Sequence, residues 1–270
     1  MIRHDKRQEQ VSWPVFQIDY LLQFQPPIAS NQPADDLETI DGKPVCCRLL
    51  SHLKIKETNM IKTVLCIGDS NTYGLNPETN GRFPREKRWT GILQKLLGDD
   101  YYIIEEGYNG RTTAFNDASD ETRSAITMIP FIMQTHSPVD LVIIMLGTND
   151  TQTQYSVSPK VSAFALKNVV ERIRRWCRGK GCSEPAFLLV SPIMIGDKIE
   201  DSMHWEKDYS SKLKVEELPK EYRKVATMLN CSFFEAASVA EPGSDCLHMS
   251  EESHNRFANA MAKIIPNILG

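Results

Sequence analysis

The chain has 270 residues, which is enough for one large domain or two small ones with a substantial buried core, and this length excludes a short scaffold held together by disulfides. Hydrophobic residues make up 41% of the sequence and charged residues 24%, as in globular proteins, so the composition excludes wholesale disorder and a membrane protein. The net charge of -4 argues against a protein that binds nucleic acid through its phosphates, and no run approaches the roughly 20 apolar residues that span a bilayer.

The N-terminal sequence does not have the features of a secretory signal. Its first ten residues are basic, but no apolar segment with a small-residue cleavage site follows them. The seven cysteines are scattered, with no C-x-x-C pair and no Cys/His spacing typical of a zinc site. We therefore expect a cytoplasmic protein with reduced thiols and no zinc site at its cysteines.

Residues 1–59 differ in composition from the rest of the chain. They contain five of the 15 prolines and one of the 14 glycines, and they show no sustained helix or strand period. Two interpretations remain open: an N-terminal extension that is disordered or loosely docked, or a translation start assigned upstream of Met60, which directly precedes the first strong strand. In both, residues 60–270 form the single domain.

From residue 61 onward, short apolar runs alternate with amphipathic stretches. The apolar runs predict strands at residues 63–67, 102–104, 141–146, 186–190 and 232–234. The stretches between and after them predict helices at residues 88–97, 120–135, 158–178 and 219–229, and from about Ser250. Because runs that are apolar on both faces suit covered strands, we expect a three-layer α/β/α domain with a central parallel sheet of about five strands.

Sites in such sheets form at the carboxyl ends of the strands, and the segments there are unusually polar. These segments are residues 68–74, 105–113 and 147–150, with residues 245–248 before the last helix. Ser70 follows a buried strand and a glycine, where backbone N–H groups and a helix dipole can stabilise negative charge. A serine hydroxyl acts as a nucleophile at neutral pH only with an adjacent base.

His248 is the best candidate for that base. Asp245 lies three residues upstream, a spacing that lets the carboxylate reach the imidazole Nδ1–H while Nε2 faces the serine. The other histidines are less suitably placed: His4 and His52 in the extension, His136 before a strand, His204 in a polar insertion and His254 inside the last helix. An isolated Asp-x-x-His is more often a helix cap or a surface pair.

Three groups are candidate donors to an oxyanion. Asn149 can offer its side-chain amide, and Gly110 and Ser70 can offer backbone N–H groups. Glycine suits this purpose because it has no Cβ and lets backbone approach a substrate closely. Each motif is also consistent with a simple turn, but four turns in this order at one sheet edge are much less credible.

These motifs together resemble a known family. The four blocks of the SGNH (GDSL) hydrolases are similar, in order and spacing, to Gly68-Asp69-Ser70, Gly110, Gly147-x-Asn149-Asp150 and Asp245-x-x-His248. More narrowly, residues 66–74 and 141–151 look like the arylesterase and acyltransferase branch, whose mycobacterial member performs perhydrolysis. The resemblance covers about residues 60–270.

The resemblance implies the flavodoxin-like SGNH fold, with Ser70 as nucleophile, His248 as base and Asp245 as the acid that orients it. It also implies an oxyanion hole made of the Ser70 N–H, the Gly110 N–H and the Asn149 amide. Residues expected to support the site without reacting are Asp69, Asp150 and Arg111. A small-molecule ester is the implied substrate, with no metal or organic cofactor, no nucleic acid or membrane partner, and a homo-oligomeric state.

The leading hypothesis is a serine esterase that hydrolyses small acetyl or aryl esters through an acyl-enzyme, with acyl transfer or perhydrolysis as open additions. One alternative is a flavodoxin-like protein that binds phosphate or FMN at residues 68–72. Another is a non-catalytic SGNH binding module. The insertion at residues 196–220 has three open interpretations: a lid, a subunit contact or a solvated loop.

Overall fold

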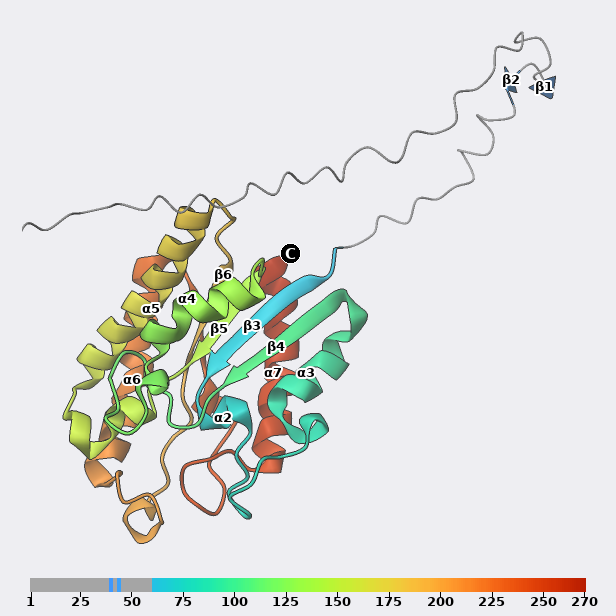
Figure 1. Cartoon of the computed structure of the whole chain (residues 1–270). Helices are drawn as coiled ribbons and strands as arrows, with labels where there is room; N and C mark the ends of the chain where they lie inside the picture. Colours follow the sequence, from blue (N-terminus) through green and yellow to red (C-terminus); the bar gives the residue numbers. More distant parts are fainter. Residues whose placement is uncertain (1–38, 41–42, 45–59) are drawn as a thin grey trace, which may run out of the picture. The chain divides into compact units, whose positions relative to one another are not determined.

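The computed structural model describes residues 39–40, 43–44 and 60–270 (Figure 1). The chain divides into two units, Met1–Thr58 and Asn59–Gly270. In the first unit, the described residues form an antiparallel pair of short strands, β1 (Thr39–Ile40) and β2 (Lys43–Pro44). The two interpretations of residues 1–59 otherwise concern residues outside the described part of the chain.

The second unit is built around a parallel sheet of five strands, which confirms the prediction from the apolar runs. The order of the strands is β4-β3-β5-β6-β7, and every neighbouring pair is parallel. The strands are β3 (Lys62–Gly68), β4 (Tyr101–Gly107), β5 (Leu141–Met145), β6 (Ala186–Ser191) and β7 (Ser232–Glu235). Counted from β3, this is the order 2-1-3-4-5 of flavodoxin-like folds.

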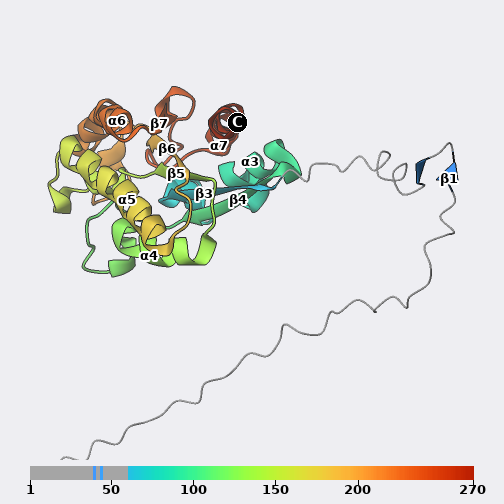
Figure 2. The ribbon, with the colours of Figure 1, turned by 90° about the horizontal axis from the view of Figure 1, so that it is seen from above.

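Helices cover both faces of this sheet. On one face, Leu65 and Ile67 of β3 pack in a core with α4 (Ala125–His136), α5 (Pro159–Lys180) and α6 (Tyr209–Leu229). On the other face, Val64 and Cys66 pack with α3 (Trp89–Leu97) and α7 (Glu251–Leu269). Figure 2 shows the sheet between these two layers. Alternate β3 residues are apolar and buried on both sides, so the three-layer prediction is confirmed.

Helix α6 is longer than the sequence pattern predicted. The predicted start at Pro219 is wrong, because the helix begins at Tyr209 and Pro219 lies inside it. Asp208 caps this start: its carboxylate accepts a hydrogen bond from the Ser211 N–H at 2.9 Å, and the Ser211 hydroxyl accepts one from the Asp208 N–H at 3.3 Å. Residues 209–220 of the insertion are therefore helical. In the described part of the chain, no helix is long and apolar enough to cross a membrane.

The topology gathers the ends of three strands at one place. β3 lies between β4 and β5, so successive connections leave in opposite directions at the carboxyl end of β3. The short helix α2 (Ser70–Tyr73) follows β3, and a 3-10 helix (Asn149–Thr151) follows β5. Figure 1 shows α2 at the tips of β3 and β4. This switch point is where a flavodoxin-like sheet binds its ligand.

Candidate active site

The turn after β3 places Ser70 at the N-terminus of α2. Asp69 is the N-cap residue, and its carboxylate accepts a hydrogen bond from the Asn71 N–H at 3.0 Å. Gly68 permits the close approach of α2 to the strand, because a Cβ there would lie 2.0 Å from Thr72 Oγ1. Burial raises the pKa of Asp69, although the hydrogen bond from Asn71 opposes this shift. Asp69 thus contacts the turn that presents Ser70.

Ser70, His248 and Asp245 form one chain of hydrogen-bonding contacts. Ser70 Oγ lies 2.8 Å from His248 Nε2, and His248 Nδ1 lies 2.5 Å from Asp245 Oδ2. Ser70 is the first residue of α2, directly after β3, and the other two residues come from the loop before α7. The fold therefore joins a serine and a histidine that are 178 residues apart. An imidazole held in this way can take a proton from the serine hydroxyl.

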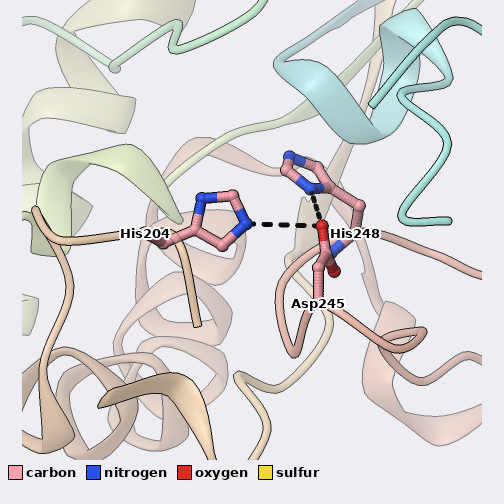
Figure 3. A group of neighbouring side chains, drawn as sticks. All are labelled: His204, Asp245 and His248. Carbon is pink, nitrogen blue, oxygen red and sulfur yellow. Dashed lines mark hydrogen bonds and ion pairs between the residues drawn. The ribbon is translucent and has the colours of Figure 1, made fainter. Parts of the chain in front are cut away.

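The Asp245 carboxylate is held at both oxygens. Oδ1 accepts hydrogen bonds from the backbone N–H groups of Leu247 and His248, each at 2.9 Å. Oδ2 contacts two imidazoles, because His204 Nε2 lies 3.3 Å from it in addition to His248 (Figure 3). Burial raises the pKa of Asp245, but the hydrogen bonds from His204 and His248 outweigh burial and hold it well below its usual range. Asp245 therefore stays ionised at neutral pH.

Gly110 and Asn149 line the same cavity as Ser70. Gly110 has a φ of 74°, and a Cβ there would lie 2.8 Å from Arg123 Nε. Asn149 Nδ2 donates a hydrogen bond to the Arg111 carbonyl oxygen at 3.0 Å, which orients the amide and leaves its second N–H for another acceptor. Within residues 60–270, the backbone N–H groups of Ser70 and Gly110 make no hydrogen bond to the protein. The wall of this cavity thus carries three N–H donors that can serve another acceptor.

Arg111 and Asp150 tie the strand ends together. Arg111 Nη1 donates to the carbonyl oxygens of Gly68, at 3.2 Å, and Glu106. The two carboxylate oxygens of Asp150 accept from the Thr113 N–H and hydroxyl, both at 2.8 Å. Burial lowers the pKa of Arg111 and raises the pKa of Asp150 to about 6. These contacts hold the loop after β4 against β3 and against the loop after β5.

A cavity of about 820 Å³ lies over Ser70. Much of its wall consists of neutral polar side chains: Asn80, Asn109, Asn116, Ser119, Gln152 and Gln154. Tyr155 and Trp205 add aromatic surface, and Trp205 is 86% exposed. A cavity with this size and mixture of groups suits a small ester with polar substituents.

The insertion after β6 supplies several side chains to the site, among them His204, Trp205 and Lys207, although the sequence left its role open between a lid, a subunit contact and a solvated loop. His204 contacts Asp245, although its place in a polar insertion made it a poor candidate for the base. Lys207 is buried, and its Nζ donates to the Thr148 carbonyl oxygen at 2.7 Å. Burial lowers the pKa of Lys207 to about 8. No local pattern pairs this loop with the strand ends.

Asn71 was also missed, although it directly follows Ser70. Its Oδ1 accepts from the Met249 N–H at 2.8 Å, and its Nδ2 donates to the Leu247 carbonyl oxygen at 3.4 Å. Asn71 therefore holds the backbone on both sides of His248. Its position beside the serine was the one available signal in the sequence.

His204, Asp245 and His248 are also the one group in the described residues whose ligand atoms could converge on a metal ion, since these atoms lie within 4.8 Å of one another. However, His248 Nδ1 and Asp245 Oδ2 are 2.5 Å apart. Two ligands at about 2.0–2.2 Å from one tetrahedral zinc ion would be separated by about 3.3 Å. The arrangement therefore fits a hydrogen bond better than a shared cation.

The fold and the chemistry at its switch point place the protein among the α/β ester hydrolases of the SGNH type. The profile of the GDSL-like lipase/acylhydrolase family matches residues 66–256, and the chain belongs to this family. This membership makes the protein a carboxylic ester hydrolase and favours this activity over the FMN-binding alternative. No match to the sequence was found among curated proteins.

Several solved structures resemble the chain. The native aryl esterase of M. smegmatis is 34% identical, with a TM-score of 0.72, over 77% of this chain and 100% of the esterase. The carbohydrate acetylesterase Est24 of Sinorhizobium meliloti is 34% identical, with a TM-score of 0.70, over 76% of this chain and 99% of Est24. A further carbohydrate acetylesterase family member from Sinorhizobium meliloti is 31% identical, with a TM-score of 0.71, over 77% of this chain and 99% of that protein. The likeness supports the arylesterase branch that the sequence motifs indicate.

Proposed function

We propose that the protein is a serine esterase in which Ser70 is the nucleophile, His248 the base and Asp245 the acid that orients the base. The observation that carries this proposal is the chain of contacts from Ser70 Oγ to His248 Nε2 at 2.8 Å and from His248 Nδ1 to Asp245 Oδ2 at 2.5 Å. His248 takes the serine proton as Oγ attacks the ester carbonyl carbon. The N–H groups of Ser70 and Gly110 and the Asn149 amide stabilise the oxyanion that forms.

The second half of the reaction releases the acyl group. The tetrahedral intermediate collapses, the alcohol leaves with the proton held by His248, and the acyl group stays on Ser70 as an ester. A water molecule, activated by His248, then attacks this ester and yields the carboxylic acid and free Ser70. An alcohol in place of water gives acyl transfer, and hydrogen peroxide gives a peracid, so one acyl-enzyme serves all three reactions.

The proposed substrates are small acyl esters, acetyl esters above all, of aromatic or polyhydroxylated alcohols. The amide-rich wall of the 820 Å³ cavity offers hydrogen-bond donors and acceptors to hydroxyl groups, and Trp205 and Tyr155 offer aromatic surface. The similarity to an aryl esterase and to carbohydrate acetylesterases supports the same choice.

Replacement of Ser70 tests the proposal. Ser70→Ala is expected to lower hydrolysis of p-nitrophenyl acetate by a factor of at least about 10³, because the variant lacks the hydroxyl that carries the acyl group. A fluorophosphonate probe should label the wild type and not the variant, whose thermal unfolding should match the wild type. Wild-type turnover by Ser70→Ala would refute the assignment.

A panel of esters separates the finer activities. Rates should fall from acetyl to octanoyl p-nitrophenyl esters, and acetylated sugars should be deacetylated. Acetylated product from an alcohol added to largely aqueous buffer would demonstrate acyl transfer, and its absence would leave hydrolysis alone.

We also propose that the protein self-associates, as the family resemblance implies. Phe131 of α4 and Phe164 of α5 are 65% and 58% exposed, and their helices are neighbours in the structure. Sedimentation velocity on the full chain is the direct measurement, and a monomer at micromolar concentration would contradict the proposal.

A further inference from the structure

We propose that His204 is a positioning residue for the reaction: its Nε2–H holds the Asp245 carboxylate in the orientation that His248 requires. This inference rests on the proposed roles of Ser70, His248 and Asp245. It gives a role in the reaction to the insertion after β6, for which the sequence left three interpretations open.

The first argument is the way in which the Asp245 carboxylate is held. The backbone N–H groups of Leu247 and His248 fix Oδ1. Oδ2 is contacted by His248 Nδ1 at 2.5 Å and by His204 Nε2 at 3.3 Å, from two different directions (Figure 3). In the proposed reaction, His248 gains and loses a proton and its contact to Oδ2 changes with each step. His204 takes no part in this transfer, so it keeps Oδ2 in place throughout.

The second argument is the exclusion of water. The side chains of His204 and Asp245 are only 20% and 17% exposed. The rings of His204 and His248 meet edge to face, with their centroids 5.3 Å apart and their planes at 66°. His204 therefore covers the contact between Asp245 and His248 on one side, where water would otherwise compete for the carboxylate and weaken its interaction with the imidazole.

The third argument is that the loop carrying His204 is itself anchored. The Lys207 N–H donates to the His204 carbonyl oxygen at 2.8 Å, and Lys207 Nζ donates to the Thr148 carbonyl oxygen at 2.7 Å. The Thr153 N–H donates to the Glu206 carbonyl oxygen at 3.0 Å. The loop is thus tied to both sides of the segment that contains Asn149. It therefore links the segment that contains Asn149 to the Asp245 carboxylate, which His204 contacts.

The proposal also requires a proton on one particular nitrogen of the His204 ring, Nε2. Only an imidazole that carries a proton on Nε2 can donate to a carboxylate oxygen. The nearest acidic group to the other nitrogen is Glu206, whose Oε1 lies 3.8 Å from His204 Nδ1, beyond hydrogen-bonding distance. A ring with a proton on Nε2 therefore satisfies the contact with Asp245.

Three substitutions at His204 test the proposal. A glutamine amide nitrogen reaches about as far as His Nε2, an asparagine amide nitrogen reaches only as far as Nδ1, and alanine has no donor. A hydrogen bond to a charged group contributes enough to change a rate by about tenfold or more. We expect His204→Ala and His204→Asn to lower kcat for p-nitrophenyl acetate about tenfold, with KM within about twofold, and His204→Gln to restore kcat to within about threefold of the wild type.

Two controls accompany these variants. Met203→Ala, at an 81% exposed neighbour in the same loop, should leave kcat unchanged. Thermal unfolding identifies any variant that fails to fold. The proton between His248 Nδ1 and Asp245 should give a strongly downfield NMR signal that persists in His204→Gln and broadens in His204→Asn.

The proposal is wrong if kcat of His204→Asn equals that of the wild type, or if His204→Gln is as slow as His204→Asn. It is also wrong if KM rises while kcat stays constant, because His204 would then be a substrate contact in the cavity wall. Retained activity in Ser70→Ala would instead refute the proposed function, so the two failures are distinguishable.

Discussion

Replacement of Asn71 by leucine should weaken both the fold and the reaction. The side chain is buried, and its amide joins the turn that carries Ser70 to the loop that carries His248. Leucine has nearly the same shape but no polar atom. Asn71→Leu therefore leaves the Met249 N–H and the Leu247 carbonyl oxygen without their partner in a site that has little access to water.

The loss in the free energy of unfolding follows from the two hydrogen bonds that Asn71 makes. The hydrogen bond to Met249 at 2.8 Å has full strength, and loss of the partner of a buried N–H costs about 2 kcal/mol. The contact to Leu247 at 3.4 Å is long, and we assign it about 0.5 kcal/mol. Together they give a loss of about 2.5 kcal/mol in the free energy of unfolding. For a domain of about 210 residues, this corresponds to a fall in Tm of about 5–10 °C.

The assay combines thermal unfolding with steady-state kinetics. Because Leu247 and Met249 flank His248, kcat for p-nitrophenyl acetate should fall about tenfold or more as the imidazole loses its alignment with Ser70. Asn267→Leu is the matched control: Asn267 is exposed, and its amide donates to the Lys263 carbonyl oxygen of the same helix. It should change the free energy of unfolding by less than about 0.5 kcal/mol. A Tm and a kcat of Asn71→Leu equal to those of the control would refute the reasoning.

Two further predictions concern the oxyanion donors and acid stability. Asn149→Ala should lower kcat by about 10²–10³ with a small change in KM, because the proposed role of the amide is to stabilise charge that develops only in the transition state. A change confined to KM would contradict this. His254 is buried and accepts a hydrogen bond from the Trp89 N–H, and burial lowers its pKa to about 3 from a usual 6.5. As the pH falls below 6.5, His254 therefore takes up a proton in the unfolded state before it does so in the folded state. The free energy of unfolding is then lower at pH 5 than above pH 6.5, by about 2 kcal/mol. His254→Asn keeps an acceptor without a titrating group, so urea unfolding at pH 7 and pH 5 should show a smaller decrease than in the wild type; an equal decrease would exclude His254 as its source.

The sequence by itself determined the layered sheet and the local parts of the site. Apolar runs such as 141–146 can only be buried on both faces, which requires helices on both sides of a parallel sheet. The turn at Ser70 and the Asp245-x-x-His248 spacing are also local, because the chain over three or four residues sets which side chains can meet.

The tertiary structure decided which distant groups meet. His204 is 41 residues from Asp245 in sequence, and Asn71 is 178 residues from Met249. No periodicity or spacing encodes such pairs, because they depend on how the loops before α6 and α7 pack at the strand ends. The start of α6 at Tyr209 was hidden by Pro219, which lies inside the helix, where the sequence suggested a helix start. The insertion, whose role the sequence left open, places His204 against Asp245, and buried Lys207 holds that loop to the Thr148 carbonyl oxygen.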